Sequence, residues 1–273
     1  MISEERQKHI EKAVDYYLQN EINVGNCAKL FGIHRTTLGQ YILKRNPDYN
    51  SRRRYSIDEH FFDSIDTEEK AYILGYLTAD GCIKSKPGEI KIGLSVKDID
   101  ILEQMRRAMK NEKPLKIVTK PSYAFGSEEK AAVMSISCAK MYRSLESCGF
   151  SPQKSKHEVF CDKVPKHLYH HYIRGIFDGD GWFSYTLKNG TKEVGFGMGQ
   201  SILDSIRNVF CEIGVSEKYT VSPYKKIFRY RITSTEDVKK IFDYLYKDAT
   251  IFLKRKHDKM LDFCRLKASS QKS

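Results

Sequence analysis

Two aspartates, Asp80 and Asp180, stand 100 residues apart, and each one closes a similar short segment. Residues 73–81 read Ile-Leu-Gly-Tyr-Leu-Thr-Ala-Asp-Gly, and residues 173–181 read Ile-Arg-Gly-Ile-Phe-Asp-Gly-Asp-Gly. Two carboxylates that are held close together repel each other unless a cation lies between them. Carboxylate oxygens combined with phosphate oxygens suit Mg²⁺. If the fold brings the two aspartates together, they form a candidate site for a divalent cation.

Two helices must position these aspartates. Residues 68–80 have the apolar spacing of a helix, and Thr67 can cap its N-terminus. Gly75 falls inside this helix and Gly175 falls inside its repeat, although a glycine inside a helix costs about 1 kcal/mol relative to alanine. Small residues allow two helix backbones to approach closely, so we expect the helices to pack face to face through these glycines. Their C-terminal aspartates then become neighbours.

A single helix that ends in Asp-Gly is usually only a helix with a glycine terminator. A repeat at a fixed period instead indicates two copies of one structural unit. Both segments resemble the LAGLIDADG motif of homing endonucleases. The resemblance covers about residues 68–260. It implies an α+β fold of two pseudo-symmetric subdomains, each with the element order αββαββα and a saddle-shaped antiparallel sheet of four strands.

The sequence between and after the motifs agrees with that order. Alternating residues and turn signals predict two hairpins in each copy, and apolar periodicity predicts the helices. The expected hairpin strands are 82–85 with 90–96, 115–125 with 131–138, 182–187 with 193–198, and 219–224 with 228–233. The expected helices are 98–110, 140–148, 201–213 and 235–246, followed by a terminal helix at 252–266 that has no counterpart in the first copy.

The resemblance further implies a nuclease that cuts both strands of a long DNA site with Mg²⁺ or another divalent cation such as Mn²⁺. Asp80 and Asp180 match the family's metal-binding acids, and the backbone carbonyls of Ala79 and Gly179 are expected to add ligands. Metals held in this way activate water and stabilise the leaving oxygen.

The match to the family is incomplete in two places. The earlier acid of the motif is Asp178 in the second copy but Thr78 in the first. The family also uses a lysine near the end of each subdomain's last strand, and Lys140 matches it in the first half. The corresponding stretch of the second half has no lysine. Either Lys225 or Lys226 of the hairpin turn serves there, or that strand is cut more slowly.

The N-terminal part of the chain resembles a helix-turn-helix of the resolvase or transposase kind. A helix is expected at residues 3–20, and residues 24–42 carry the motif with Gly32 at the turn. The second helix of the motif would present four side chains to the major groove, Arg35, Thr36, Thr37 and Gln40. Helical hairpins of this size also occur as plain packing units, and that alternative stays open. A basic stretch follows, with Arg52, Arg53 and Arg54.

Alternation along the strands selects the side chains that face away from the core and could contact DNA. The expected contacts are Lys84, Lys86, Lys91 and Ser95 in the first copy, and Ser184, Thr186, Lys188 and Lys192 in the second, together with Lys225 and Lys226 of the hairpin turn. Because the copies differ in sequence, one chain would read an asymmetric site. The expected domains are 1–50 (helix-turn-helix), 51–66 (basic linker), 67–150 (first subdomain), 151–267 (second subdomain with C-terminal helix) and 268–273 (tail).

The overall charge favours an anionic partner. The net charge is +12 and the isoelectric point is about 9.2, as in many nucleic-acid-binding proteins. No apolar stretch approaches the roughly 20 residues needed to cross a bilayer. We therefore expect a cytoplasmic monomer, encoded by a bacterium or a phage, that binds double-stranded DNA. Two other functions stay open: an RNA-splicing maturase, and a DNA-binding regulator that keeps the fold without cleavage.

Overall fold

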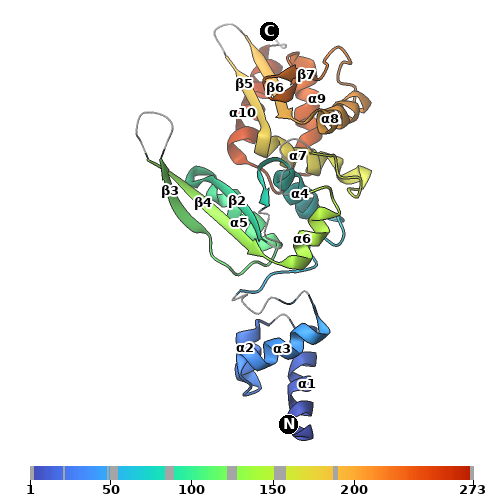
Figure 1. The fold of residues 1–273 in the computed structure, drawn as a ribbon. Helices are drawn as coiled ribbons and strands as arrows, with labels where there is room; N and C mark the ends of the chain where they lie inside the picture. Colours follow the sequence, from blue (N-terminus) through green and yellow to red (C-terminus); the bar gives the residue numbers. More distant parts are fainter. Residues whose placement is uncertain are drawn as a thin grey trace.

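A pair of helices forms the centre of the molecule. The computed structural model of the chain describes residues 3–20, 22–47, 49, 55–83, 89–121, 128–150, 158–186 and 190–270. The central helices are α4 (Glu68–Asp80) and α7 (Tyr169–Asp180), which lie side by side in Figure 1. Thr67 caps α4, because its Oγ1 accepts a hydrogen bond from Lys70 N at 3.3 Å. Residues 71–78 are all buried, so α4 is a core helix rather than a surface helix.

Each central helix is followed by the predicted order of elements. The first half contains β1 (Cys82–Ile83), β2 (Glu89–Ser95), η1 (Val96–Asp98), α5 (Ile99–Ala108), β3 (Lys116–Pro121), β4 (Glu128–Ser137) and α6 (Ala139–Glu146). The short turn η3 (Lys166–Leu168) leads into α7. The second half then contains β5 (Gly181–Tyr185), β6 (Lys192–Met198), α8 (Gln200–Glu212), β7 (Ser222–Tyr224), β8 (Ile227–Ile232), α9 (Thr235–Leu245) and α10 (Lys254–Ser270). The predicted α+β class is confirmed.

Both sheets are antiparallel and have four strands, in the orders β1-β2-β4-β3 and β5-β6-β8-β7. In each sheet the strand that follows the motif helix lies at one edge. The third strand of the subdomain lies at the other edge. Several element ends differ from the prediction, most of all at three places: β4 begins at Glu128 rather than at residue 131, β7 begins at Ser222 rather than at residue 219, and α10 ends at Ser270 rather than at residue 266.

One face of each sheet belongs to the core. The buried positions are Ile90, Ile92 and Leu94 in β2, and Val194, Phe196 and Met198 in β6. Helices α5 and α8 contact these strands. The alternate residues of each strand form the opposite face, which we call the outward face.

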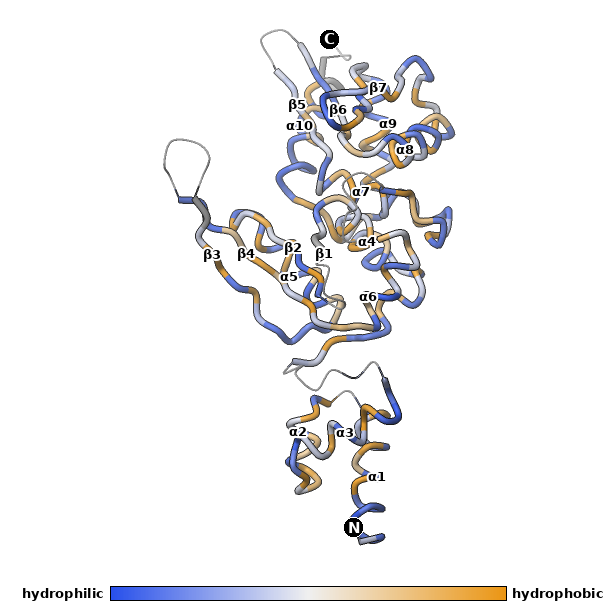
Figure 2. Tube along the Cα trace, in the orientation of Figure 1, coloured by the Kyte–Doolittle hydropathy of each residue, from blue (hydrophilic) through white to orange (hydrophobic). Residues whose placement is uncertain are grey.

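The N-terminal head has a core of its own. Helices α1 (Glu4–Gln19), α2 (Val24–Leu30) and α3 (Arg35–Arg45) together bury Ile10, Val14, Leu38 and Ile42. Gly32, between α2 and α3, has a φ of +63°, which glycine adopts without strain. The remaining buried apolar residues of the described chain form a second cluster that runs through both halves. Figure 1 shows the head set apart at the N-terminal end, and Figure 2 shows apolar positions in the head as well as in the rest of the chain. The predicted domain boundaries stay predictions.

Among the described helices, none combines the length and apolar character that a membrane span requires.

Candidate active site

The two central helices touch through their glycines. A Cβ atom added at Gly75 would overlap the carbonyl of Tyr172, and one added at Gly175 would overlap the carbonyl of Tyr72. Each glycine therefore allows the partner backbone to approach to a distance that a side chain would prevent. The structure places both residues at the helix contact where the sequence analysis expects them.

The C-terminal ends of the helices meet at the next small residues. A Cβ atom added at Gly179 would overlap the Cβ of Ala79 and would lie 3.5 Å from the amide nitrogen of Asp80. Asp80 and Asp180 are the last residues of their helices, and both are exposed. Tyr76 donates a hydrogen bond to Asp80 Oδ2 at 3.3 Å. Asp80 and Asp180, which we call the acid pair, therefore stand where the two halves join.

The acid pair fits a divalent cation in its chemistry. Ionised carboxylates only accept hydrogen bonds, and their oxygens are the ligands that hard cations prefer. The carbonyls of Ala79 and Gly179 belong to the same helix ends. Within the described residues, no group of three or more His, Cys, Asp or Glu side chains is arranged to hold a metal ion. A cation at the acid pair would complete its shell with water or phosphate oxygens, as Mg²⁺ commonly does.

Behind the acid pair, the helices exchange hydrogen bonds at matched positions. Tyr72 donates to Asp178 Oδ2 at 2.7 Å, and the hydroxyl of Tyr172 lies 3.1 Å from Thr78 Oγ1. The Thr78 hydroxyl also donates to the carbonyl of Leu74 at 2.9 Å. The threonine that departs from the family motif is thus satisfied within the helix contact and leaves no buried charge there.

Asp178 connects α7 to the start of α10. Its Oδ2 also accepts a hydrogen bond from Leu253 N, the residue directly before α10, at 2.7 Å. The residue is only 1% exposed. Burial raises the pKa of its carboxyl to about 6, while the hydrogen bond from Leu253 and the charge of Lys256 act in the opposite direction.

Lys256, in the first turn of α10, reaches the end of α7 that carries Asp180. Its Nζ donates to the carbonyl oxygens of Phe177 at 2.6 Å, Asp178 at 2.9 Å and Gly181 at 2.5 Å. Burial lowers the pKa of this amine to about 8, while the carboxylates of Asp178 and of the acid pair act in the opposite direction. With a pKa of about 8 this amine is mostly protonated at neutral pH, and the neutral fraction, which can accept a proton, grows as the pH rises through 8.

A buried ion pair fixes the segment that leads into α10. Arg174 donates to Glu68 Oε1 at 2.6 Å and to the carbonyls of Leu245 at 2.8 Å and Ile251 at 3.1 Å. Glu68 in turn accepts hydrogen bonds from the backbone nitrogens of Thr250 at 2.7 Å and Ile251 at 3.1 Å. Side chains of both central helices therefore fix the segment that precedes α10. The position of this segment in turn sets the position of Lys256.

The three lysines chosen from the sequence lie elsewhere. Lys140 pairs with Asp63 at 3.4 Å and contacts the ring of His60 at 2.8 Å, in the segment before the N-terminus of α4. The acid pair stands at the other end of α4, so the prediction that Lys140 is catalytic is corrected. Lys225 and Lys226 join β7 to β8, and β7 lies three strand spacings of about 4.8 Å each from β5, which follows Asp180. Neither lysine is placed to replace Lys256.

The predicted DNA contacts on α3 and on the sheets are mostly accessible. Arg35, Thr36 and Gln40 are exposed, and Thr37 is half-buried. Lys91, Ser95 and Ser184 lie on outward faces, and Thr186 follows the end of β5 and is exposed. The residues Arg52, Arg53, Arg54, Lys84, Lys86 and Lys188 lie outside the described part of the chain.

Lys192 is assigned to the wrong face. In β6 it shares the register of Val194 and Phe196, which point into the core, whereas Glu193 takes the outward position. An error of one residue in the phase of a strand moves every side chain to the other face. The same alternation, applied to β8, selects Arg229 and Arg231, which the sequence analysis missed.

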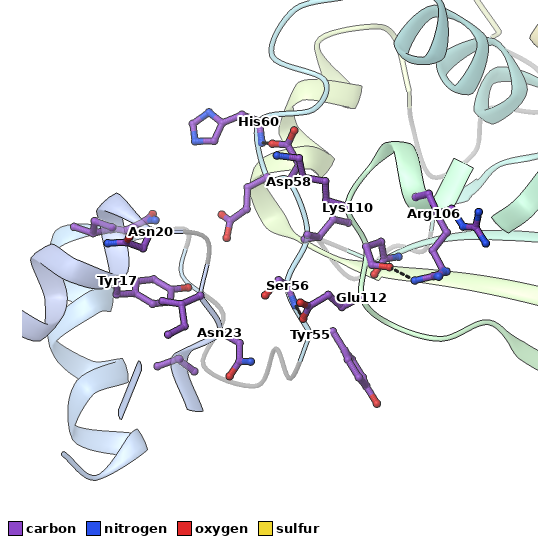
Figure 3. A pocket seen from close by; sticks show the side chains of 18 residues that line it. Tyr17, Asn20, Asn23, Tyr55, Ser56, Asp58, His60, Arg106, Lys110 and Glu112 are labelled. Carbon is purple, nitrogen blue, oxygen red and sulfur yellow. Dashed lines mark hydrogen bonds between the residues drawn. The ribbon is translucent and has the colours of Figure 1, made fainter. Parts of the chain in front are cut away.

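A pocket of about 510 Å³ lies between the head and the first half (Figure 3). Its lining includes Tyr17 and Asn20 of the head, Tyr55 of the following segment, and Arg106 and Lys110 at the end of α5. Neither central helix contributes to it. The acid pair is exposed and lies outside this pocket.

Comparisons with known proteins show that the chain is similar to LAGLIDADG proteins. Residues 67–119 match the LAGLIDADG-like domain. The homing endonuclease I-WcaI, solved bound to its DNA recognition sequence, is similar with a TM-score of 0.53 at 12% identity, over 71% of this chain and 87% of that chain. The meganuclease I-SmaMI bound to uncleavable DNA gives a TM-score of 0.48 at 12% identity, over 74% and 90%. The N-terminal LAGLIDADG domain of DUF199/WhiA gives 0.42 at 15% identity, over 69% and 87%.

No curated protein matches the chain in sequence. The chain contains a LAGLIDADG-like domain, and its two halves together have the fold of the two-subdomain LAGLIDADG homing endonucleases. At 12% identity this likeness establishes the fold and not the activity.

Proposed function

We propose that the protein is a site-specific DNA endonuclease that makes a metal-dependent double-strand break at a long, asymmetric duplex site. The observation that carries the proposal is the exposed acid pair at the junction of the two halves, with the amine of Lys256 beside it. A fold alone does not imply this chemistry. Two exposed carboxylates at adjoining helix ends, next to a lysine of lowered pKa, would supply the groups that phosphodiester hydrolysis needs.

Asp80 and Asp180 would hold the divalent cation, Mg²⁺ or Mn²⁺, with help from the carbonyls of Ala79 and Gly179. When bound, such a cation activates water and stabilises the leaving oxygen. Lys256 would accept a proton from the attacking water when its amine is neutral. Asp178 acts through Lys256, because its hydrogen bond to Leu253 N fixes the start of α10.

The outward faces of the two sheets would bind the duplex on either side of the acid pair, and the head would contact a further DNA segment through α3. The net charge of +12 supports binding to a polyanion. Since one chain carries both motif helices, it would act as a monomer with internal pseudo-two-fold symmetry. The unequal halves would then read an asymmetric sequence.

Cleavage of a randomised duplex library tests the proposal. The library is incubated with the protein and Mg²⁺, and the new ends are sequenced, with Asp80→Asn protein as the matched control. We expect ends that recur at one sequence with the wild type and disappear with the variant. A library that stays intact with both Mg²⁺ and Mn²⁺ would contradict the proposal. Sequence-specific binding without cleavage would favour a regulator, and ends in an RNA substrate alone would favour a maturase.

A further inference from the structure

The outward face of the second sheet carries a row of aromatic and arginine side chains. Trp182 of β5 is in register with Gly195 of β6, which is in register with Arg231 of β8. One step along, Gly197 of β6 is in register with Arg229 of β8. All of these positions alternate with buried core residues of the same strands, so they lie on the face proposed to meet DNA.

The two glycines of β6 clear space for this row. A Cβ atom added at Gly195 would overlap the indole of Trp182, and one added at Gly197 would lie 3.1 Å from Ile227 Cδ1 and 3.6 Å from Trp182. Glycine in the interior of a strand often marks a close approach of another group. Here the bare central strand lets Trp182 lie across it toward Arg229, whose Cζ is 5.4 Å from the ring centroid.

Arg229 is held by aromatic stacking rather than by hydrogen bonds. Its Cζ lies 3.2 Å from the ring centroid of Tyr224. Within the described chain, it has these ring contacts and no hydrogen bond or ion pair to a carboxylate or carbonyl. A guanidinium that stacks on a ring keeps its N–H donors, which lie in its plane, available to an acceptor.

Arg231, two residues further along β8, differs from Arg229 because an acidic side chain pairs with it. It forms an ion pair with Glu193 at 3.3 Å, and Glu193 also accepts a hydrogen bond from Trp182 Nε1 at 2.8 Å. The acidic side chain on this face is therefore already engaged with Arg231 and Trp182. This leaves Arg229 as the arginine on the face that is oriented but not neutralised by an acid within the described chain.

We propose that Arg229 determines sequence specificity by recognising a guanine in the half-site that the second sheet contacts, with Trp182 and Tyr224 as positioning residues. The inference rests on the proposed function. Guanine presents O6 and N7 as two acceptors in the major groove, and arginine pairs with both through its two parallel donors. A planar guanidinium that is already held in place can form both hydrogen bonds without a further loss of side-chain freedom.

The described residues of the first sheet include no such arginine held by aromatic rings. Its outward face has Gly93, Ala131 and Val133 at its centre, with Lys91 and Lys116 beside them, and no arginine among its described residues. Small apolar side chains suit contact with the methyl group of thymine rather than with guanine. The proposed arginine contact to guanine therefore belongs to the half of the site that the second sheet contacts.

A binding selection tests this inference separately from cleavage. A randomised duplex library is selected in Ca²⁺ with the wild type, Arg229→Gln, Arg229→Lys and Arg207→Gln. Arg207 lies on α8 and donates to the carbonyls of Tyr219 and Glu217, so it serves as the matched arginine off the DNA face. For Arg229→Gln we expect the preference for guanine to be lost at one position, with about 5- to 150-fold weaker binding to the wild-type site and unchanged preferences elsewhere.

Three outcomes would overturn the inference. An unchanged selected sequence with Arg229→Gln would show that Arg229 reads no base. A uniform loss of affinity that Arg229→Lys restores, with a lower salt dependence, would assign Arg229 to a phosphate. A wild-type protein that selects no duplex sequence at all would contradict the proposed function as well, so the two failures are distinguishable. Arg207→Gln should retain both affinity and selected sequence.

Discussion

Positions offset by 100 residues occupy equivalent places on the two central helices, yet they do not all carry the same chemistry. Gly75 and Gly175 make the same backbone contact in the two directions. In contrast, Thr78 completes the helix contact, whereas Asp178 also holds the start of α10. The comparison shows that the repeat preserves the residues that bring the halves together, while the residue that holds the start of the terminal helix occurs in the second copy and not in the first.

Each half contributes one aspartate to the acid pair, so the acid pair belongs to the features that repeat. We expect Asp80→Asn and Asp180→Asn each to lower double-strand cleavage about a hundredfold or more, because each removes a carboxylate proposed to hold the cation at the reacting phosphate. DNA binding in Ca²⁺ should persist, since neither carboxylate contributes much to the contact area. Cleavage and binding assays on the selected duplex check both statements. Full cleavage by either variant would remove that residue from the active site and break the equivalence of the two acids.

The helix contact should tolerate a large side chain at neither of its two glycines. Gly175→Leu and Gly75→Leu each insert four carbons where backbones touch, and overpacking of this kind destabilises a protein by about 1 to 3 kcal/mol or more. Thermal melts should fall for both variants. Gly93→Ala is the control, because its added Cβ would meet Val133 Cγ2 at an ordinary 3.7 Å. If both leucine variants melted like this control, the central helices would not form the interface described above.

The two halves should differ most in Lys256, because the first half has no counterpart of this residue. We expect Lys256→Gln to slow cleavage about a hundredfold, the low end for loss of a general base. Burial lowers the pKa of Lys256 to about 8, so its neutral fraction increases as pH rises through that value. Wild-type cleavage should therefore increase with pH through about 8, and the variant should lose this rise. Lys259→Gln, one turn further along α10, is the control, because Lys259 donates to the carbonyl of Phe183 in β5 instead. A pH profile of Lys256→Gln that matches the wild type would exclude the proton-transfer role.

Deletion of the head should have the smallest effect on cleavage. Deleting residues 1–50 should leave a protein that cleaves but binds more weakly, with a salt dependence flatter by about 0.9 for each phosphate that the head neutralises. The separate apolar core of the head makes the deletion compatible with folding of the rest. Titrations at several salt concentrations measure the slope. An unchanged slope and affinity would mean that the head does not touch DNA.

The sequence was sufficient for the shared features because they repeat. Two glycines and two terminal acids at the same spacing predicted a helix pair, and the strand patterns predicted the sheets. Lys256 could not be found in this way, because it belongs to the terminal helix and has no repeat in the first half. Its place depends on the clamp between Glu68, Arg174 and the segment at Thr250, which involves residues 182 positions apart in the chain.

The wrong assignments have local causes. Lys140 was chosen for its position after a strand, but its ammonium group pairs with Asp63 instead. Lys192 was given the wrong face because the phase of β6 was shifted by one residue. Arg229 gave no local signal beyond alternation, since its significance comes from ring contacts across neighbouring strands.

Binding of Mn²⁺ at the acid pair tests the central claim most directly. Electron paramagnetic resonance can measure bound Mn²⁺ for the wild type, Asp80→Asn, Asp180→Asn and the double variant, each with the selected duplex present. We expect the wild type to bind Mn²⁺, each single variant to bind it more weakly, and the double variant to lose binding while still holding DNA. Mn²⁺ binding that is unchanged in the double variant would contradict the assignment of the metal site to Asp80 and Asp180.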